Sequence, residues 1–317
     1  MRTFPEPTSL NRLTAQPEVD DYPDPARVLW EDVSDYNRNH PFWERTADFV
    51  PYEPMRWEGP VSALLRDIGP VAAAGETSSE SLKGVLWHPS LITRAVIDSS
   101  IEGDDRIRLI NATTNLGVGL YAGQPIAHEY ETLSEQLTSA GLAGATVTQS
   151  HDEVTHFASF RSRAAGAAAV LAWTIPEGKR LLVMPICYSG FLPGIRTALE
   201  YRRRRPDADI RLYPFRFSMH KLGDTEPRLT PEEERYVQQI GRGRTIVLVD
   251  DDASRGETLQ SAVSHMKALF PRSRVIGVAN RDYRTGDARD RQGRLWQRRQ
   301  LRLRDTGKIL DSLLHGR

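Results

Sequence analysis

The feature that most constrains the fold is a regular alternation of short apolar segments and helix-like segments in the second half of the chain. The apolar segments are typical of buried strands, and segments of helical length separate them. Such an alternation predicts an α/β fold with a parallel sheet and right-handed crossovers. The predicted strands are 180–185, 209–217, 245–249 and 274–279.

Helices are predicted between these strands, and the first half of the chain has a different character. The expected helices are 192–204, a short helix from Pro231 and 258–270, preceded by an alanine-rich helical pattern over 154–173. Residues 1–60 are rich in Pro, Asp and aromatic residues and predict an extended arm. No internal repeat or known module is evident up to residue 125, so the sequence predicts an α/β core with an added N-terminal region.

Composition limits the partners and the compartment. The 317 residues include 42 Lys and Arg and 42 Asp and Glu, so the formal net charge is zero and does not indicate a nucleic-acid or membrane partner. Cys187 is the only cysteine, which excludes an intrachain disulfide. No window approaches the roughly 20 apolar residues of a membrane span. We therefore expect a cytoplasmic protein without a membrane partner, and we do not expect nucleic acid as a partner.

Two unusual turns follow predicted strands, and both carry residues suited to binding. Ligands of parallel α/β sheets bind at the carboxyl ends of the strands. The first turn covers 187–190, and the second covers 250–256 and leads into a helix. Successive N–H groups of a turn and a helix N-terminus suit a phosphate, whereas the carboxylates of Asp250 and Asp251 would suit hydroxyl groups.

The second turn carries a family resemblance. The segment 249–258, Val-Asp-Asp-Asp-Ala-Ser-Arg-Gly-Glu-Thr, resembles the phosphoribosyl-pyrophosphate (PRPP) motif of type I phosphoribosyltransferases. In that family two acidic residues hold the ribose hydroxyls and a Gly-x-Thr turn holds the 5′-phosphate. The chain departs from the pattern at Asp252, usually apolar, and at Arg255, usually threonine.

The first turn and a later polar segment extend the resemblance over about residues 150–285. The segment 185–198 is similar to the family's pyrophosphate loop, with Ser189 and Gly190 at the matching positions. The polar segment 218–230 corresponds to the family's mobile flap, whose length and polarity suit a lid. Closing would bring Lys221, His220 or Arg228 toward pyrophosphate.

The resemblance implies a role for each matching residue. Asp250, Asp251 and Lys221 are the implied catalytic residues. Pyrophosphate is assigned to Tyr188, Ser189 and Gly190, and the 5′-phosphate to Ala253, Ser254, Arg255, Gly256, Glu257 and Thr258. Mg²⁺ is expected to arrive with PRPP, with Asp250 and Asp251 as its possible protein ligands. The implied organisation is an N-terminal extension over 1–125, a phosphoribosyltransferase-like core over 126–285 and an Arg-rich tail over 286–317.

Other interpretations of the same residues stay open. The segment 246–258, a strand followed by an acidic cluster and a helix, also resembles the first part of a response-regulator receiver domain. The 36 residues after Arg281 are too few for the rest of that domain. The aspartates could cap a helix, and Cys187 could be a buried apolar group. The Arg202-Arg-Arg-Arg205 run suits a solvated helix end, with an anion or RNA contact as the second interpretation.

The expected function follows from the resemblance. A type I phosphoribosyltransferase displaces pyrophosphate from C1 of PRPP and transfers the 5-phosphoribosyl group to an acceptor. We expect a specialised small-molecule acceptor of a biosynthetic pathway, a hood formed by the N-terminal half with residues 280–283, and a homodimer. A non-catalytic PRPP or nucleotide sensor is the alternative, favoured by Arg255 and by the Arg-rich tail.

Overall fold

The central feature of the protein is a mainly parallel sheet. The computed structural model describes residues 4–13, 56–75, 85–150, 161–219, 223–253 and 257–282. Strands lie in the order β1-β5-β4-β7-β8, with β6 also paired to β4. Strands β5 (Ile210–Leu212), β4 (Leu181–Cys187), β7 (Thr245–Ala253) and β8 (Val275–Asp282) are parallel, and β1 (Thr8–Ser9) is antiparallel to β5. The predicted α/β class with a parallel sheet is confirmed.

The expectation of one strand over 209–217 is wrong. The segment forms two short strands, β5 and β6 (Phe215–Arg216), which both pair with β4. Pro214 lies between them and has no N–H to donate to a ladder, which accounts for the interruption. The break leaves Arg216 at the carboxyl end of the sheet.

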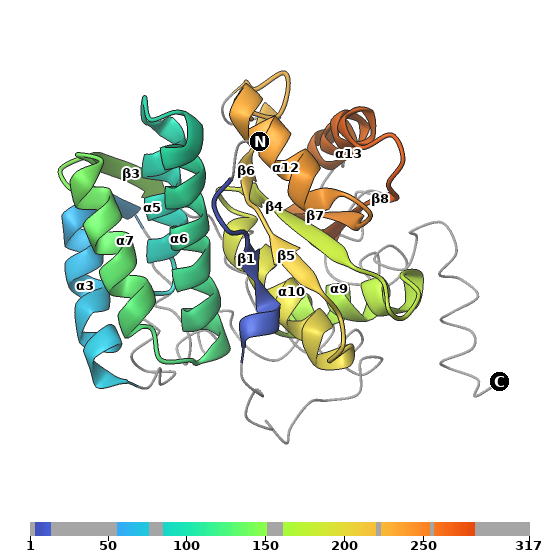
Figure 1. Cartoon of the computed structure of the whole chain (residues 1–317), viewed down its shortest axis with the longest axis horizontal. Helices are drawn as coiled ribbons and strands as arrows, with labels where there is room; N and C mark the ends of the chain where they lie inside the picture. Colours follow the sequence, from blue (N-terminus) through green and yellow to red (C-terminus); the bar gives the residue numbers. More distant parts are fainter. Residues whose placement is uncertain are drawn as a thin grey trace, which may run out of the picture.

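Helices cover both faces of the sheet (Figure 1). On one face α9 (Arg161–Thr174) and α10 (Phe191–Arg204) pack against each other, and α10 contacts β4 and β7. On the other face α12 (Pro231–Gly241) contacts β4, and α13 (Glu257–Leu269) contacts β7 and β8. Thr230 begins α12 with a capping box to Glu233, and Pro231 occupies its first turn. The helices predicted after β4, β6 and β7 are therefore confirmed.

The N-terminal half adds a helical layer, on the left in Figure 1. It contains α3 (Val61–Ala74), α5 (His88–Asp98), α6 (Gly103–Ala122) and α7 (Ala127–Ser139), together with the antiparallel pair β2 (Arg56–Pro60) and β3 (Thr146–Ser150). Helix α6 contacts β1, α10 and α12, so it joins this layer to the sheet. Residues 127–150 pack with the helical layer through α7 and β3.

The chain start reaches the sheet as well. Within the predicted extended arm, residues 14–55 lie outside the described ranges. The short 3-10 helix η1 (Leu10–Arg12) follows β1, and the side chain of Leu10 is fully buried in the main hydrophobic core. No helix within the described ranges is both long and apolar enough to cross a bilayer.

Candidate functional site

The strand order places a topological switch point between β4 and β7. From β4 the chain crosses to β5 on one side, and from β6 it crosses back through α12 to β7 on the other side. A crevice opens at such a point outside the carboxyl ends of the two strands, and it is the usual ligand site of open α/β sheets. The turn predicted over 187–190 begins at the last residue of β4. The prediction of a turn over 250–256 is wrong for residues 250–253, which form the end of β7 because they pair with β8.

Gly190 brings the two turns together. A Cβ atom at this position would overlap the carbonyl oxygen of Ile186 and lie 3.0 Å from that of Val249. The turn after β4 is therefore packed against the residue that precedes Asp250, and only glycine fits there. The Cys187–Tyr188 peptide at the start of the turn is cis.

Asp250 and Asp251 lie at the far end of β7 and are 6% and 8% exposed. The Asp250 side chain accepts a hydrogen bond of 3.0 Å from the backbone N–H of Asp251. Burial and, after it, the negative charge of Asp250 raise the pKa of the Cys187 thiol. Cys187 is therefore a protonated, buried apolar group, and its neighbour Asp250 shows that the two strand ends lie close together.

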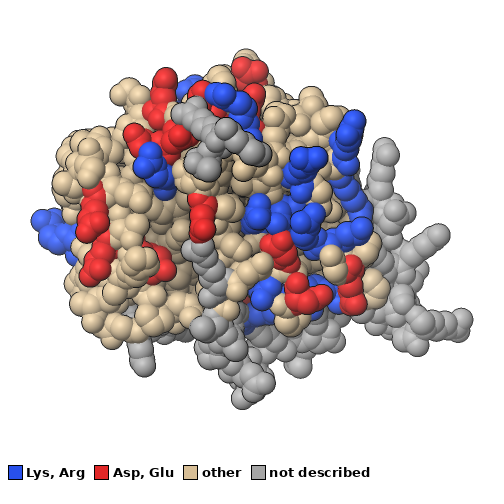
Figure 2. All heavy atoms as spheres, in the orientation of Figure 1, with Lys and Arg blue, Asp and Glu red and all other residues tan. Residues whose placement is uncertain are grey.

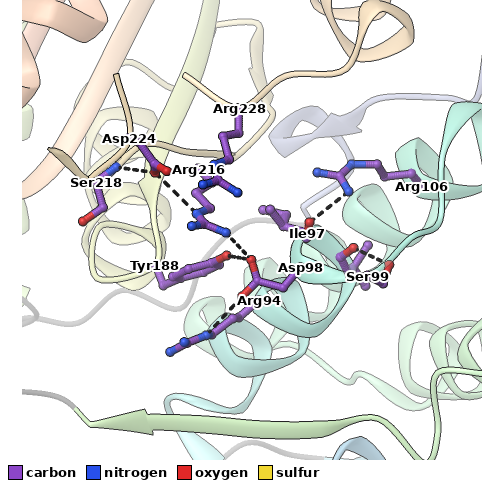
Figure 3. Close-up of polar contacts among 11 residues, drawn as sticks. Arg94, Ile97, Asp98, Ser99, Arg106, Tyr188, Arg216, Ser218, Asp224 and Arg228 are labelled. Atoms are coloured by element: carbon purple, nitrogen blue, oxygen red, sulfur yellow. Dashed lines mark hydrogen bonds and ion pairs between the residues drawn. The ribbon is translucent and has the colours of Figure 1, made fainter. Parts of the chain in front are cut away.

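Tyr188 is held by the helical layer (Figure 3). Its hydroxyl donates a 2.6 Å hydrogen bond to Asp98 Oδ1 at the end of α5, and the Ser90 hydroxyl donates to the Tyr188 carbonyl at 2.9 Å. Burial, followed by the hydrogen bond to Asp98, raises the pKa of Tyr188 well above its ordinary value. Tyr188 thus remains a neutral hydrogen-bond donor.

Guanidinium groups surround this tyrosine. Arg94 and Arg216 lie over its ring, with their central carbons 5.1 and 5.8 Å from the ring centroid. Arg216 also pairs with Asp98 and lies 3.4 Å from Asp224. Burial disfavours the charge of Arg216, but Tyr188, Asp98 and Asp224 outweigh it and raise its pKa. A buried, permanently charged cation therefore lies beside the turn after β4.

The segment predicted as a flap contributes to this cluster. Asp224 accepts from Arg228 Nε at 2.7 Å and from the Ser218 backbone N–H at 2.9 Å. Figure 3 shows Arg228 and Arg216 on the same side of Asp224. Arg228, one of the three cations predicted to approach pyrophosphate, is thus held next to Arg216.

The predicted site residues have different outcomes. Tyr188, Ser189, Gly190, Asp250 and Asp251 lie together at the switch point. Glu257 and Thr258 open α13, and Ala253 ends β7. Lys221, His220, Ser254, Arg255 and Gly256 lie outside the described residues. Asn280, predicted to line the hood, is in β8, is fully buried and accepts a 3.0 Å hydrogen bond from Thr197.

The sequence prediction missed Asp98, Arg94 and Arg216. Asp98 and Arg94 belong to a helix in the half of the chain without a recognised motif, and 90 residues separate Asp98 from Tyr188. Arg216 had a weak signal, because it lies near the end of an apolar segment predicted as a strand. No local pattern could have shown that these residues meet.

Asp250 and Asp251 could supply two carboxylate ligands to a metal ion, but the described residues at the switch point do not form a complete set of metal ligands. The described residues contain no group of three or more His, Cys, Asp or Glu side chains placed to hold a metal. Mg²⁺ commonly uses one or two protein carboxylates and takes its other ligands from substrate phosphates and water. Asp250 and Asp251 fit a magnesium ion that is carried by a phosphorylated substrate.

A separate cavity of about 510 Å³ lies between the N-terminal segment, α6 and α7. Its lining includes Glu6, Asn111, His128 and Glu129, and none of the predicted site residues contributes to it. A cavity of this volume could hold a small ligand. The convergence of two turns at the switch point is the stronger argument, because it rests on topology and on matching chemistry.

Comparison with known proteins gives no relative: no protein-family model, curated protein or solved structure matches the chain. The functional argument therefore depends on residues and geometry.

Proposed function

We propose that the protein binds PRPP at the switch point between β4 and β7 and transfers its 5-phosphoribosyl group to a small-molecule acceptor, with release of pyrophosphate. The observation that carries this proposal is the packing of Gly190 against Val249, next to Asp250. It joins the turn that resembles the pyrophosphate loop to the turn that resembles the PRPP motif. In PRPP the pyrophosphate is bonded to C1 of the ribose, so the binding sites of these two groups must be adjacent.

Asp250 and Asp251 are assigned to the ribose hydroxyls. Both carboxylates are buried at the end of β7, where they would repel a phosphate but accept hydrogen bonds from hydroxyl groups. The N-terminus of α13 follows four residues after Ala253 and is assigned to the 5′-phosphate, because the N–H groups and the dipole of a helix N-terminus favour an anion. This division keeps the acidic pair, near the end of β7, apart from the phosphate, at the start of α13.

The turn from Tyr188 to Gly190 is assigned to pyrophosphate, with Arg94 and Arg216 as its cations. Negative charge accumulates on the leaving pyrophosphate while positive charge develops on the ribose, so preorganised charges of both signs would stabilise the transition state. Arg216 is already fixed by Asp98 and Asp224. Fixing the guanidinium before substrate binds reduces the reorganisation that the reaction requires.

Mg²⁺ would be bound through the substrate, with Asp250 or Asp251 as a protein ligand, and would neutralise part of the pyrophosphate charge. The acceptor is expected to enter from the side of the helical layer, since α5 supplies the residues that hold Tyr188. We also propose that the acceptor is a specialised small molecule and that the protein is a homodimer.

The test is calorimetry of Mg-PRPP binding to the wild-type chain and to Asp251→Asn. The substitution keeps the shape of the side chain but removes its charge, so we expect about tenfold weaker binding or more, the equivalent of one charge-assisted hydrogen bond. Asp207→Asn is the matched control, because Asp207 is exposed near the opposite end of the sheet. Equal affinities for all three chains would refute the site.

A PRPP sensor without catalysis is the second candidate, favoured by Arg255 in place of the family's threonine. Pyrophosphate release from Mg-PRPP, measured with a panel of amine, aromatic acid and aminocyclitol acceptors, separates the two candidates. Turnover with any acceptor supports the enzyme. Saturable binding without turnover supports the sensor.

A further inference from the structure

A row of arginines lies at the end of the sheet opposite the candidate site. Arg180, Arg244 and Arg274 immediately precede β4, β7 and β8. The Arg180 carbonyl accepts from the Thr245 N–H and the Arg274 carbonyl from the Ile246 N–H, both at 2.9 Å. The three residues therefore begin adjacent strands, about 5 Å apart in the usual sheet spacing.

Further basic residues extend this row into a surface, which we call the basic edge. Its other members are Arg204 and Arg205 at the end of α10 and Arg242 before β7. Figure 2 shows many Lys and Arg on the right of the view, over the end of the sheet where the strands begin, with a smaller number of Asp and Glu among them in its lower part. Since the whole chain has zero formal net charge, this is a local concentration of positive charge.

Backbone carbonyls hold two of these guanidinium groups in place. Arg274 donates to the Thr174 carbonyl at 2.8 Å, and Arg205 donates to the Ala172 carbonyl at 3.1 Å. A carbonyl orders a guanidinium but carries no net charge. Arg205 also pairs with the exposed carboxylate of Glu177, whereas the exposed groups of Arg180 and Arg242 face solvent.

Arg244 has a different role from the rest of the row. It is buried and pairs with Asp209 at 2.6 Å, so it stabilises the sheet. Burial and the charge of Arg244 lower the pKa of the neighbouring Arg211. Cations are thus crowded here even beneath the surface, which favours the approach of an anion from solvent.

An exposed tryptophan lies within the basic edge. Trp173 is 53% exposed and is the large hydrophobic side chain that stands out as exposed among the described residues. It lies between Ala172 and Thr174, whose carbonyls hold Arg205 and Arg274. The backbone on both sides of the exposed tryptophan therefore orders a guanidinium group.

We propose that the basic edge binds single-stranded nucleic acid, with Arg180, Arg242 and Arg274 contacting phosphates and Trp173 stacking on a base. A positively charged surface with an aromatic platform is the arrangement that binds single strands without sequence preference. An anionic membrane fits less well, since interfacial anchoring needs several exposed apolar side chains. The formal net charge of zero did not indicate this partner, because a net charge does not show where on the surface the charges lie.

The test is fluorescence anisotropy of a labelled oligouridine of about 12 nucleotides, within the usual site size, titrated with the full chain at several salt concentrations. Trp173→Ala should weaken binding about tenfold through lost stacking, with an unchanged salt slope. Trp173→Phe should restore part of the affinity. Arg180→Gln and Arg242→Gln should each lower the magnitude of the salt slope by about 0.7.

Arg66→Gln is the matched control, because Arg66 is an exposed arginine on α3. It should leave both affinity and slope unchanged. The proposal fails if the oligonucleotide does not bind saturably, if Trp173→Ala binds as well as wild type, or if phosphatidylserine vesicles bind more tightly than RNA. Mg-PRPP affinity is measured on the same variants and should not change, so the outcome is separate from that of the proposed function.

Discussion

Gly190 is the residue on which the proposed site depends most directly, because its missing side chain allows two backbone segments to meet. We expect Gly190→Ala to destabilise the fold by about 2 kcal/mol, the usual cost of overpacking a well-packed position. The added Cβ would overlap the Ile186 carbonyl and press against that of Val249. Urea denaturation measures the loss, and Mg-PRPP calorimetry should show weaker binding.

Gly144→Ala is the control for this change. A Cβ at Gly144 would meet no atom within 4 Å, and its backbone angles are not in the left-handed region. The free energy of unfolding of this variant should equal that of the wild type or exceed it by about 0.5 kcal/mol, because alanine makes the unfolded chain less flexible than glycine does. Similar losses in the two variants would show that the close contact at Gly190 is not important.

His88 should make stability depend on pH. Its side chain is 3% exposed, and burial lowers its pKa below 6.5 although Asp67, 3.2 Å away, opposes the shift. The stabilising contribution is complete above pH 6.5, where the ring is neutral in both states. It declines as the pH falls from 6.5 toward the lowered folded-state pKa, because the unfolded chain takes up a proton first.

The measurement compares wild type with His88→Gln by urea denaturation at about pH 7.5 and pH 5.5, on either side of the ordinary histidine pKa. The stability advantage of the wild type should shrink at the lower pH, by at most about 1.4 kcal/mol per pH unit. An advantage that stays constant between the two pH values would contradict a lowered pKa for His88.

Among the elements, α6 and α12 are joined by a buried ion pair. Arg106 Nε lies 3.0 Å from Glu233 Oε2, and Glu233 also accepts from the Tyr213 hydroxyl at 2.8 Å. Arg106→Met would leave Glu233, 1% exposed, without its cation. We expect a loss of about 3–5 kcal/mol in thermal or urea unfolding, as for other broken buried pairs.

Arg108→Met on the same helix is the comparison. Arg108 and its partner Asp105 are 55% and 71% exposed, so their separation should cost less than about 1 kcal/mol. If both variants lost the same stability, the buried pair would not be what links α6 to α12.

The elements themselves were largely predictable from the sequence, because buried parallel strands are continuous apolar runs. The exceptions have local causes. The strand predicted to end at Val249 continues to Ala253, because β8 pairs with Asp250 and Asp252 although acidic residues are unusual in strands. The strand over 209–217 is divided at Pro214, which cannot donate to the ladder.

The site was predictable only in part, and sequence separation explains the difference. Tyr188 and Gly190 lie in the turn after β4, and Asp250 and Asp251 lie at the end of β7, in segments whose own residues indicate a ligand. Asp98 and Arg216 meet across 118 residues, and no repeating pattern connects them. The contribution of the helical layer to the site therefore required the three-dimensional structure.

At the scale of the whole molecule, the helical layer and the sheet share one hydrophobic core. Leu10 from the N-terminal segment, Ile110 from α6, Ile195 from α10 and Val237 from α12 belong to the same buried cluster. If one part unfolded alone, it would expose apolar surface of the other part to water. The described parts should therefore unfold together. The boundary after residue 125 rests on a change in sequence pattern, and its interpretation as a domain boundary stays a prediction.

The basic edge also has a consequence for how the protein behaves during purification. A molecule with a calculated pI of about 7.1 would be expected to pass through a charged column at neutral pH. Because the basic edge concentrates cations at one end of the sheet, we expect the molecule to turn that end toward a cation-exchange resin. It should be retained at low salt, and Arg242→Gln should elute earlier than Arg66→Gln although both variants have the same net charge.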